Sequence, residues 1–288
     1  MKKPAGGCAS CRADAGDWRA VGRRAIVARV PTINRRNLLT EVTAVCLALL
    51  PGVGAAAEIA VAAASNFSMA LTELAADFEA RTEHRLRVSL ASTGKLYAQI
   101  ANGAPYDVLL AADSERPLLL EKSGDGVAGS RFTYAIGALV LWSRDPTLAG
   151  RDCRDILSDT EGGRIAIANP ETAPYGAAAR DFLRRAGLWD AVAGRLAYGE
   201  NIAQALQFAA SGNARAGFIA EAQAIDPRLP AATCRWHVPS DLHEPLEQQA
   251  LLLRRGAGEP AATEFLGYLE SDAARAIILR HGYRLPEH

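Results

Sequence analysis

After the first 57 residues, short apolar segments alternate with longer amphipathic ones, and this rhythm is what most restricts the fold. Residues 59–64 read as a strand, and residues 68–81 carry apolar side chains at helical spacing. Further strands are expected at 86–90, 107–111, 164–168 and 216–219, and further helices at 95–102, 176–186, 202–211 and 261–281. Strands that alternate with helices are typical of an α/β protein.

Two long apolar runs, at 132–142 and 248–253, stand apart from this alternation. We interpret them as the places where the chain crosses from one domain to another and later returns. The sequence therefore predicts a discontinuous first lobe made of residues 58–135 and 246–288, with a second lobe of residues 136–245 inserted between its parts.

Residues 34–57 have the features of an export signal. Basic Asn34-Arg35-Arg36 precedes an apolar stretch at 38–53, and small Ala55-Ala56-Ala57 predicts cleavage after Ala57. The pair Arg35-Arg36 also fits a twin-arginine signal, although ordinary export signals often contain two arginines. An internal amphipathic helix is the alternative interpretation of this segment.

The charge and the cysteines are divided unevenly between the first 57 residues and the rest of the chain. The first 57 residues hold nine Lys/Arg and three acidic residues, so 23 basic and 29 acidic residues remain, a net charge of −6. A mildly acidic body gives no reason to expect nucleic acid as a partner. Cys8, Cys11 and Cys46 fall in the leader region, and Cys153 and Cys234 are free to form one disulfide in an oxidising compartment.

Four predicted junctions place small or hydroxyl-bearing residues where a helix begins. The start of a helix has backbone N–H groups without internal partners and a partial positive charge, so several starts that meet in one cleft can bind an anion. Each junction alone is also explained by ordinary helix capping. The junctions are Ser65-Asn66, Ser92-Thr93-Gly94, Pro174-Tyr175-Gly176 and Glu200-Asn201-Ile202.

The junctions and several other short segments resemble, in their order and spacing, those of the periplasmic molybdate-binding proteins of ABC transporters. The resemblance covers essentially all of residues 58–288. It implies a two-domain clamp, each lobe a mostly parallel sheet flanked by helices, with two crossover segments as the hinge. The matching segments are 61–67, 90–100, 102–108, 111–113, 167–170, 173–176 and 282–283.

The resemblance also implies a ligand and a set of binding residues. Molybdate or tungstate would be held by neutral hydroxyl and backbone N–H donors, with no direct metal ligand and no cofactor. Thr93 matches the hydroxyl of the family's second loop, but Ser92 is adjacent and a shift of one residue would exchange the two. The residues implied are Ser65, Asn66, Ser92 or Thr93, Tyr175 and, through its backbone N–H, Ile202.

One position departs from the family pattern. Certain members carry a second tyrosine where this chain has Ala220, so Tyr175 or Asn66 would have to replace that donor. Asp107 and Asp113 follow or end a strand and are expected to be structural.

The sequence contains no nucleophile motif, metal-ligand spacing or acid/base pair, so we expect no enzyme activity. Lys95 follows Gly94 as in a phosphate loop, but the rest of that motif is missing. The partners expected are the oxyanion and a membrane permease, and the protein is expected to be a monomer. Two alternatives keep the same clamp: a binding protein for sulfate, another small oxyanion or an organic acid, and an enzyme.

Overall fold

The computed structural model describes residues 56–159 and 162–287. The predicted export signal therefore lies outside the described residues, apart from its last two positions, as do Cys8, Cys11 and Cys46. Within the described part of the chain, no helix has the length and hydrophobicity needed to cross a membrane.

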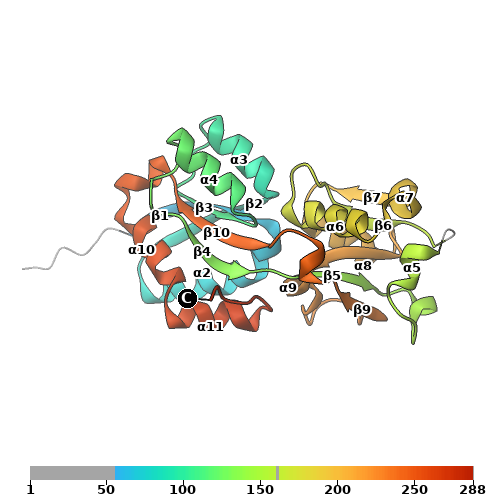
Figure 1. Cartoon of the computed structure of the whole chain (residues 1–288). Helices are drawn as coiled ribbons and strands as arrows, with labels where there is room; N and C mark the ends of the chain where they lie inside the picture. Colours follow the sequence, from blue (N-terminus) through green and yellow to red (C-terminus); the bar gives the residue numbers. More distant parts are fainter. Residues whose placement is uncertain (1–55, 160–161, 288) are drawn as a thin grey trace, which may run out of the picture. The chain divides into compact units, whose positions relative to one another are not determined.

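The described strands form two five-stranded sheets (Figure 1). The first has the order β2-β1-β3-β10-β4 and the second the order β7-β6-β8-β5-β9. The first sheet contains β1 (Glu58–Ala64), β2 (Arg85–Ala91), β3 (Val108–Ala111), β4 (Phe132–Ile136) and β10 (Glu247–Leu252). The second contains β5 (Leu139–Ser143), β6 (Ile165–Ala168), β7 (Leu196–Gly199), β8 (Ala216–Ala220) and β9 (Cys234–His237). We call the first sheet with its helices lobe 1, and the second sheet with its helices lobe 2.

Both sheets are mixed, where mostly parallel sheets were predicted. In lobe 1, β1 pairs in parallel with β2 and β3, whereas β10 is antiparallel to β3 and β4. In lobe 2, β6 is parallel to β7 and β8, whereas β5 is antiparallel to β8 and β9. The reason is the path of the chain: β5 and β10 follow the linking segments, so they enter their sheets from the end at which the parallel strands finish.

Helices cover both faces of the first sheet, and in Figure 1 α3 and α4 lie together on one side of it. Ile59, Val61 and Ala63 of β1 pack in a core with α2, α10 and α11, while Ala62 packs in a core with α3 and α4. A strand buried on both faces is apolar throughout, which explains the unbroken apolar run of β1. The helices of lobe 1 are α2 (Ser68–Arg81), α3 (Thr93–Ala101), α4 (Glu115–Ser123), α10 (Pro260–Leu269) and α11 (Asp272–Arg280). Those of lobe 2 are α5 (Asp155–Ser158), α6 (Pro174–Arg185), α7 (Trp189–Val192), α8 (Ile202–Ser211) and α9 (Glu221–Ala224).

Two segments link the lobes. The apolar run at 132–142 divides into β4 and β5, which belong to different sheets, with Gly137 and Ala138 between them. The return path runs from the end of β9 to the start of β10. The two segments touch, because the Gly137 N–H donates to the Leu246 carbonyl at 2.9 Å.

Other predicted features are settled by direct contacts. Cys153 and Cys234 form a disulfide within lobe 2. The Asp107 carboxylate accepts from the Ala60 N–H at 2.8 Å and pairs with Arg255 at 2.7 Å, so this aspartate holds β1, β3 and the segment after β10 together. Its role is structural, as predicted.

Candidate functional site

The four predicted helix junctions meet around one small cavity between the lobes. The volume of this interlobe cavity is about 10 Å³. Its walls come from the ends of strands and the starts of helices in both lobes. The lining residues are Ala64, Ser65, Asn66, Ala91, Ser92, Thr93 and Ala112 from lobe 1, and Ala173, Pro174, Tyr175 and Ile202 from lobe 2. All six residues proposed from the sequence are among them.

The first junction is a single 3-10 turn, Ser65–Phe67, between β1 and α2. Ser65 and Asn66 are buried there, and the first N–H groups of the turn have no intrahelical partners. The Asn66 side-chain amide is already engaged, since its Nδ2 donates to Gln248 Oε1 at 2.8 Å and to the Tyr283 hydroxyl at 3.0 Å. The Tyr283 hydroxyl in turn donates to the Asn66 carbonyl at 2.9 Å. The contribution that Asn66 can make to an anion is therefore its backbone N–H.

The second junction distinguishes between the two adjacent hydroxyls, Ser92 and Thr93. Thr93 Oγ1 accepts a hydrogen bond from the Ala112 N–H at 3.0 Å and so ties the start of α3 to the end of β3. Ser92 is only 3% exposed, and its Oγ has no hydrogen-bond partner among the described residues. Leaving a buried hydroxyl without a partner costs about 1–3 kcal/mol. Ser92 is thus the hydroxyl left free to bind something in the cavity.

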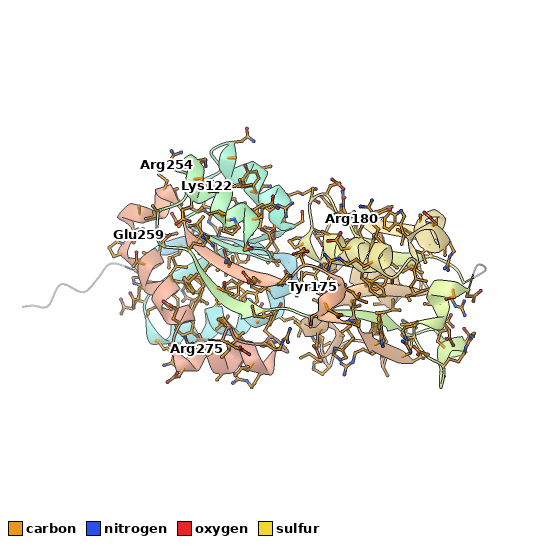
Figure 2. All side chains as sticks on the ribbon, in the orientation of Figure 1. Lys122, Tyr175, Arg180, Arg254, Glu259 and Arg275 are labelled. Atoms are coloured by element: carbon orange, nitrogen blue, oxygen red, sulfur yellow. A yellow bond between two sulfur atoms is a disulfide. The ribbon has the colours of Figure 1, made fainter. Side chains whose placement is uncertain are left out.

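The third junction places Tyr175 in the first turn of α6, where the two lobes meet (Figure 2). Its hydroxyl is buried and has no partner among the described residues. Burial raises the pKa of Tyr175 well above its usual value, because the phenolate would lose its hydration. The phenol therefore stays protonated and can act as a hydrogen-bond donor throughout the physiological pH range.

The fourth junction leaves one backbone donor free. Asn201 caps α8, and its side-chain oxygen accepts from the N–H groups of Ala203 at 3.0 Å and Gln204 at 3.1 Å. The Ala205 N–H bonds to the Asn201 carbonyl. The Ile202 N–H is the remaining donor of this turn and has no intrahelical partner. Ile202 also lines the cavity, so this donor lies at its wall.

The electrostatics of the interlobe cavity come from neutral groups. None of its lining residues carries a formal charge. The free groups, among them Ser92 Oγ, Tyr175 Oη and the Ile202 N–H, are hydrogen-bond donors at helix starts, where the helix dipole adds a partial positive charge. Such an arrangement can stabilise an anion without a salt bridge.

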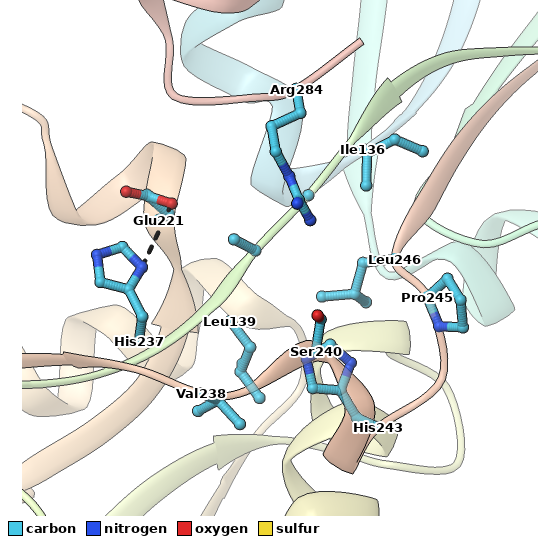
Figure 3. Close-up of a pocket in the computed structure, with 12 residues that line it drawn as sticks. Ile136, Leu139, Glu221, His237, Val238, Ser240, His243, Pro245, Leu246 and Arg284 are labelled. Carbon is cyan, nitrogen blue, oxygen red and sulfur yellow. Dashed lines mark ion pairs between the residues drawn. The ribbon is translucent and has the colours of Figure 1, made fainter. Parts of the chain in front are cut away.

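A larger cavity of about 500 Å³ lies beside the linking segments (Figure 3). Its wall includes the Glu221 carboxylate, with Oε2 3.6 Å from His237 Nδ1, and the side chain of Arg284. None of the four helix starts reaches it. This larger space therefore lacks the helix-start donors that line the interlobe cavity.

Comparison with known proteins places the chain in a family. The family profile described as bacterial extracellular solute-binding protein matches residues 59–284. The chain belongs to this family. This solute-binding protein is 44% identical over 249 residues to the molybdate-binding protein ModA of Azotobacter vinelandii, a match that covers 86% of this chain and 98% of that protein. It is 40% identical over 243 residues to ModA of Rhodobacter capsulatus, covering 83% and 94% of the two chains.

A solved structure leads to the same fold. The Azotobacter vinelandii periplasmic molybdate-binding protein matches this solute-binding protein with a TM-score of 0.75 and 39% identity, over 80% of this chain and 100% of that one. The predicted two-lobe α/β clamp is thereby confirmed.

The sequence did not indicate which residues position Asn66 and Tyr175 at the cavity of this solute-binding protein. Gln248 and Tyr283 orient Asn66 from the far end of the chain. Gly137 leaves room for the Tyr175 hydroxyl, since a Cβ at this position would overlap it. A glycine inside an apolar run was the available signal for a close approach, but nothing in the sequence indicated its neighbour.

Proposed function

We propose that this protein is an exported solute-binding protein that captures molybdate or tungstate in the interlobe cavity and delivers the anion to the membrane permease of an ABC transporter. Two curated relatives that are 40% and 44% identical over most of the chain are molybdate-binding proteins, which supports the assignment. The observation that carries it is the donor set: Ser92 Oγ and Tyr175 Oη have no partner among the described residues, the Ile202 N–H has none within its helix, and no charged side chain lines the cavity.

This donor set suits a fully deprotonated tetrahedral oxyanion. Each oxygen of a bare dianion accepts hydrogen bonds, whereas a protonated phosphate also needs an acceptor for its own proton. The cavity wall offers no carboxylate to act as that acceptor. Discrimination against sulfate would come from the size of the anion, because the spacing of the donors fixes how far apart the anion's oxygens must lie.

The proposed ligand set is Ser65, the backbone N–H of Asn66, Ser92, Tyr175 and the backbone N–H of Ile202. Thr93 stays in this set as a second hydroxyl, since a hydroxyl that accepts one bond can still donate its own proton. The Asn66 side chain is not available to replace the tyrosine that some family members carry at the position of Ala220, because its amide already donates to Gln248 and Tyr283. The Tyr175 hydroxyl is the buried phenol donor that remains.

Binding is proposed to close the clamp. We assign residues 58–135 and 246–288 to one lobe and 136–245 to the other, with each lobe supplying part of the donor set. The anion then stabilises the closed state more than the open one. We place the mature protein in the periplasm as a monomer, exported by the general or the twin-arginine route, and assign it no reaction and no nucleic-acid partner.

Calorimetric titration of the purified protein with molybdate, tungstate, sulfate and phosphate tests the assignment. Molybdate and tungstate should bind with one site per chain and at least a hundredfold more tightly than sulfate. Tyr175→Phe should weaken molybdate binding about tenfold or more, because it removes one bond to a charged acceptor. Tyr106→Phe, at a tyrosine outside the cavity whose hydroxyl bonds Gln99, is the matched control. Sulfate binding as tight as molybdate binding would refute the proposal.

A further inference from the structure

The two lobes touch directly beside the interlobe cavity, through groups that do not line it. The Gly94 N–H, in the first turn of α3, donates to the Thr172 carbonyl just before α6 at 2.8 Å. Gly94 follows Ser92 and Thr93, and Thr172 precedes the lining residue Ala173. One helix-start donor of lobe 1 is thus used to hold lobe 2 rather than left for the anion.

The absence of a side chain at Gly94 makes this contact possible. A Cβ here would lie 2.9 Å from both the Cα and the carbonyl oxygen of Thr172, closer than real Cβ contacts come. Both atoms are backbone and cannot rotate away. Gly94 lies within a regular helix, so glycine is required here by the approach of the two lobes and not by a special backbone conformation.

An ion pair adds to the contact at the next residue. Lys95 pairs with Glu200, which directly precedes the Asn201 cap of α8. The pair therefore links the helix starts that present Thr93 and Ile202 to the cavity. The side chains are 43% and 55% exposed, so the attraction is that of a surface pair, modest and sensitive to salt.

We propose that the Gly94–Thr172 hydrogen bond and the Lys95–Glu200 ion pair form a closure lock, which holds the lobes together independently of the anion and sets how long the anion stays bound. This inference rests on the proposed capture of an oxyanion by clamp closure. None of the four residues lines the cavity, so the lock acts by raising the population of the closed state that binds tightly. It controls the dissociation rate without controlling which anion is chosen.

Anion dissociation measured by stopped-flow competition tests the steric part of the lock. Gly94→Ala should speed the release of molybdate and of tungstate by the same factor, about tenfold or more, and leave their relative affinity unchanged. Gly267→Ala, in α10 with open space around the added methyl, should release both anions at the wild-type rate. X-ray scattering of the saturated proteins should give a larger radius of gyration for Gly94→Ala than for the control. Unchanged release by a folded Gly94→Ala protein overturns the lock.

Charge exchange tests the ion pair. Glu200→Lys and Lys95→Glu should each speed release about two- to fivefold at low salt, the double exchange should restore the wild-type rate, and these differences should shrink in 1 M salt. Glu200→Lys is decisive, because it adds positive charge near an anion site: simple attraction predicts slower release and the lock predicts faster release. Slower release overturns the ionic part of the lock.

The lock and the proposed ligand can fail separately. If the wild-type protein binds sulfate as tightly as molybdate, the proposed function fails, and the same variants are then measured with sulfate. If molybdate binds selectively but every variant releases it at the wild-type rate, the function stands and the lock is wrong.

Discussion

Ser92 and Thr93 are neighbours with the same functional group, yet the fold uses them differently. The Thr93 hydroxyl accepts from the Ala112 N–H, whereas the Ser92 hydroxyl has no partner within the described part of the chain. The sequence could place both residues at a helix start but could not separate them, because the difference depends on the position of β3, which is distant in the chain. The burial of each hydroxyl and its partners decide its role.

This difference predicts that two substitutions differ in their main effect. Ser92→Ala should weaken molybdate binding by about 1.5–3 kcal/mol, the value of a hydrogen bond to a charged group, with little loss of stability in the anion-free protein. Thr93→Val should instead destabilise folding by about 1–3 kcal/mol, because it leaves the Ala112 N–H buried without an acceptor. Calorimetry and urea unfolding of both variants measure the two effects. A Ser92→Ala protein with unchanged affinity would exclude Ser92 from the ligand set.

Gly137 is a second residue whose importance comes entirely from its neighbour. Gly137→Ala should displace the Tyr175 hydroxyl, lower stability by about 1–3 kcal/mol through overpacking, and weaken molybdate binding at least as much as Tyr175→Phe. Gly194→Ala, at a site with no atom within reach of the new methyl, is the matched control. If Gly137→Ala binds molybdate normally, the phenol can move and is not fixed by the hinge segment.

At the scale of elements, local patterns predicted the type of most segments but not their pairing. Strands 59–64 and 164–168 and helices 68–81 and 202–211 lie within a residue or two of the observed bounds. The antiparallel entry of β10 depends on a connection through the other lobe, which no local window contains. The final helical segment divides into α10 and α11, where the Ser271 hydroxyl accepts from the Ala274 N–H and starts a new helix. The strands β7 and β9, of four residues each, were missed because their apolar patterns are brief, and the nine-residue helix α4 was missed as well.

The sequence left open whether Cys153 and Cys234 form a disulfide, and in the structure they do. It joins Cys153, just before α5, to Cys234 at the start of β9, across 81 positions. Closing a loop of this size should stabilise the protein by about 2–4 kcal/mol, so Cys153→Ser with Cys234→Ser should lower the free energy of unfolding by that amount. Urea unfolding with and without reductant checks this. Reductant should bring the wild-type protein to the midpoint of the double variant and leave that variant unchanged; a fully reduced wild-type protein with its original midpoint would contradict it.

At the scale of the whole molecule, three fully buried phenols contribute to the response of protein stability to alkali. Burial raises the pKa of Tyr134, Tyr175 and Tyr283 above the value of about 10 expected in the unfolded chain. Their contribution to stability is therefore complete below pH 10 and is lost as pH rises further, because only the unfolded chain ionises readily there. Each tyrosine should contribute a slope of up to about 1.4 kcal/mol per pH unit.

Removing Tyr175 should reduce this alkaline loss of stability by the share of one phenol. The raised pKa of Tyr175 keeps the phenol of the folded protein protonated between pH 8 and 11, with or without the anion, so the loss in this range comes from ionisation of the unfolded chain. Molybdate should therefore add the same stability at each pH in this range. Urea unfolding and tyrosinate absorbance between pH 8 and 11 measure both effects in the wild-type protein and in Tyr175→Phe. In Tyr175→Phe, the slope above pH 10 should fall by up to about 1.4 kcal/mol per pH unit, and the stability added by molybdate should be smaller at every pH. A molybdate effect of full size in this variant would show that the phenol does not contact the anion.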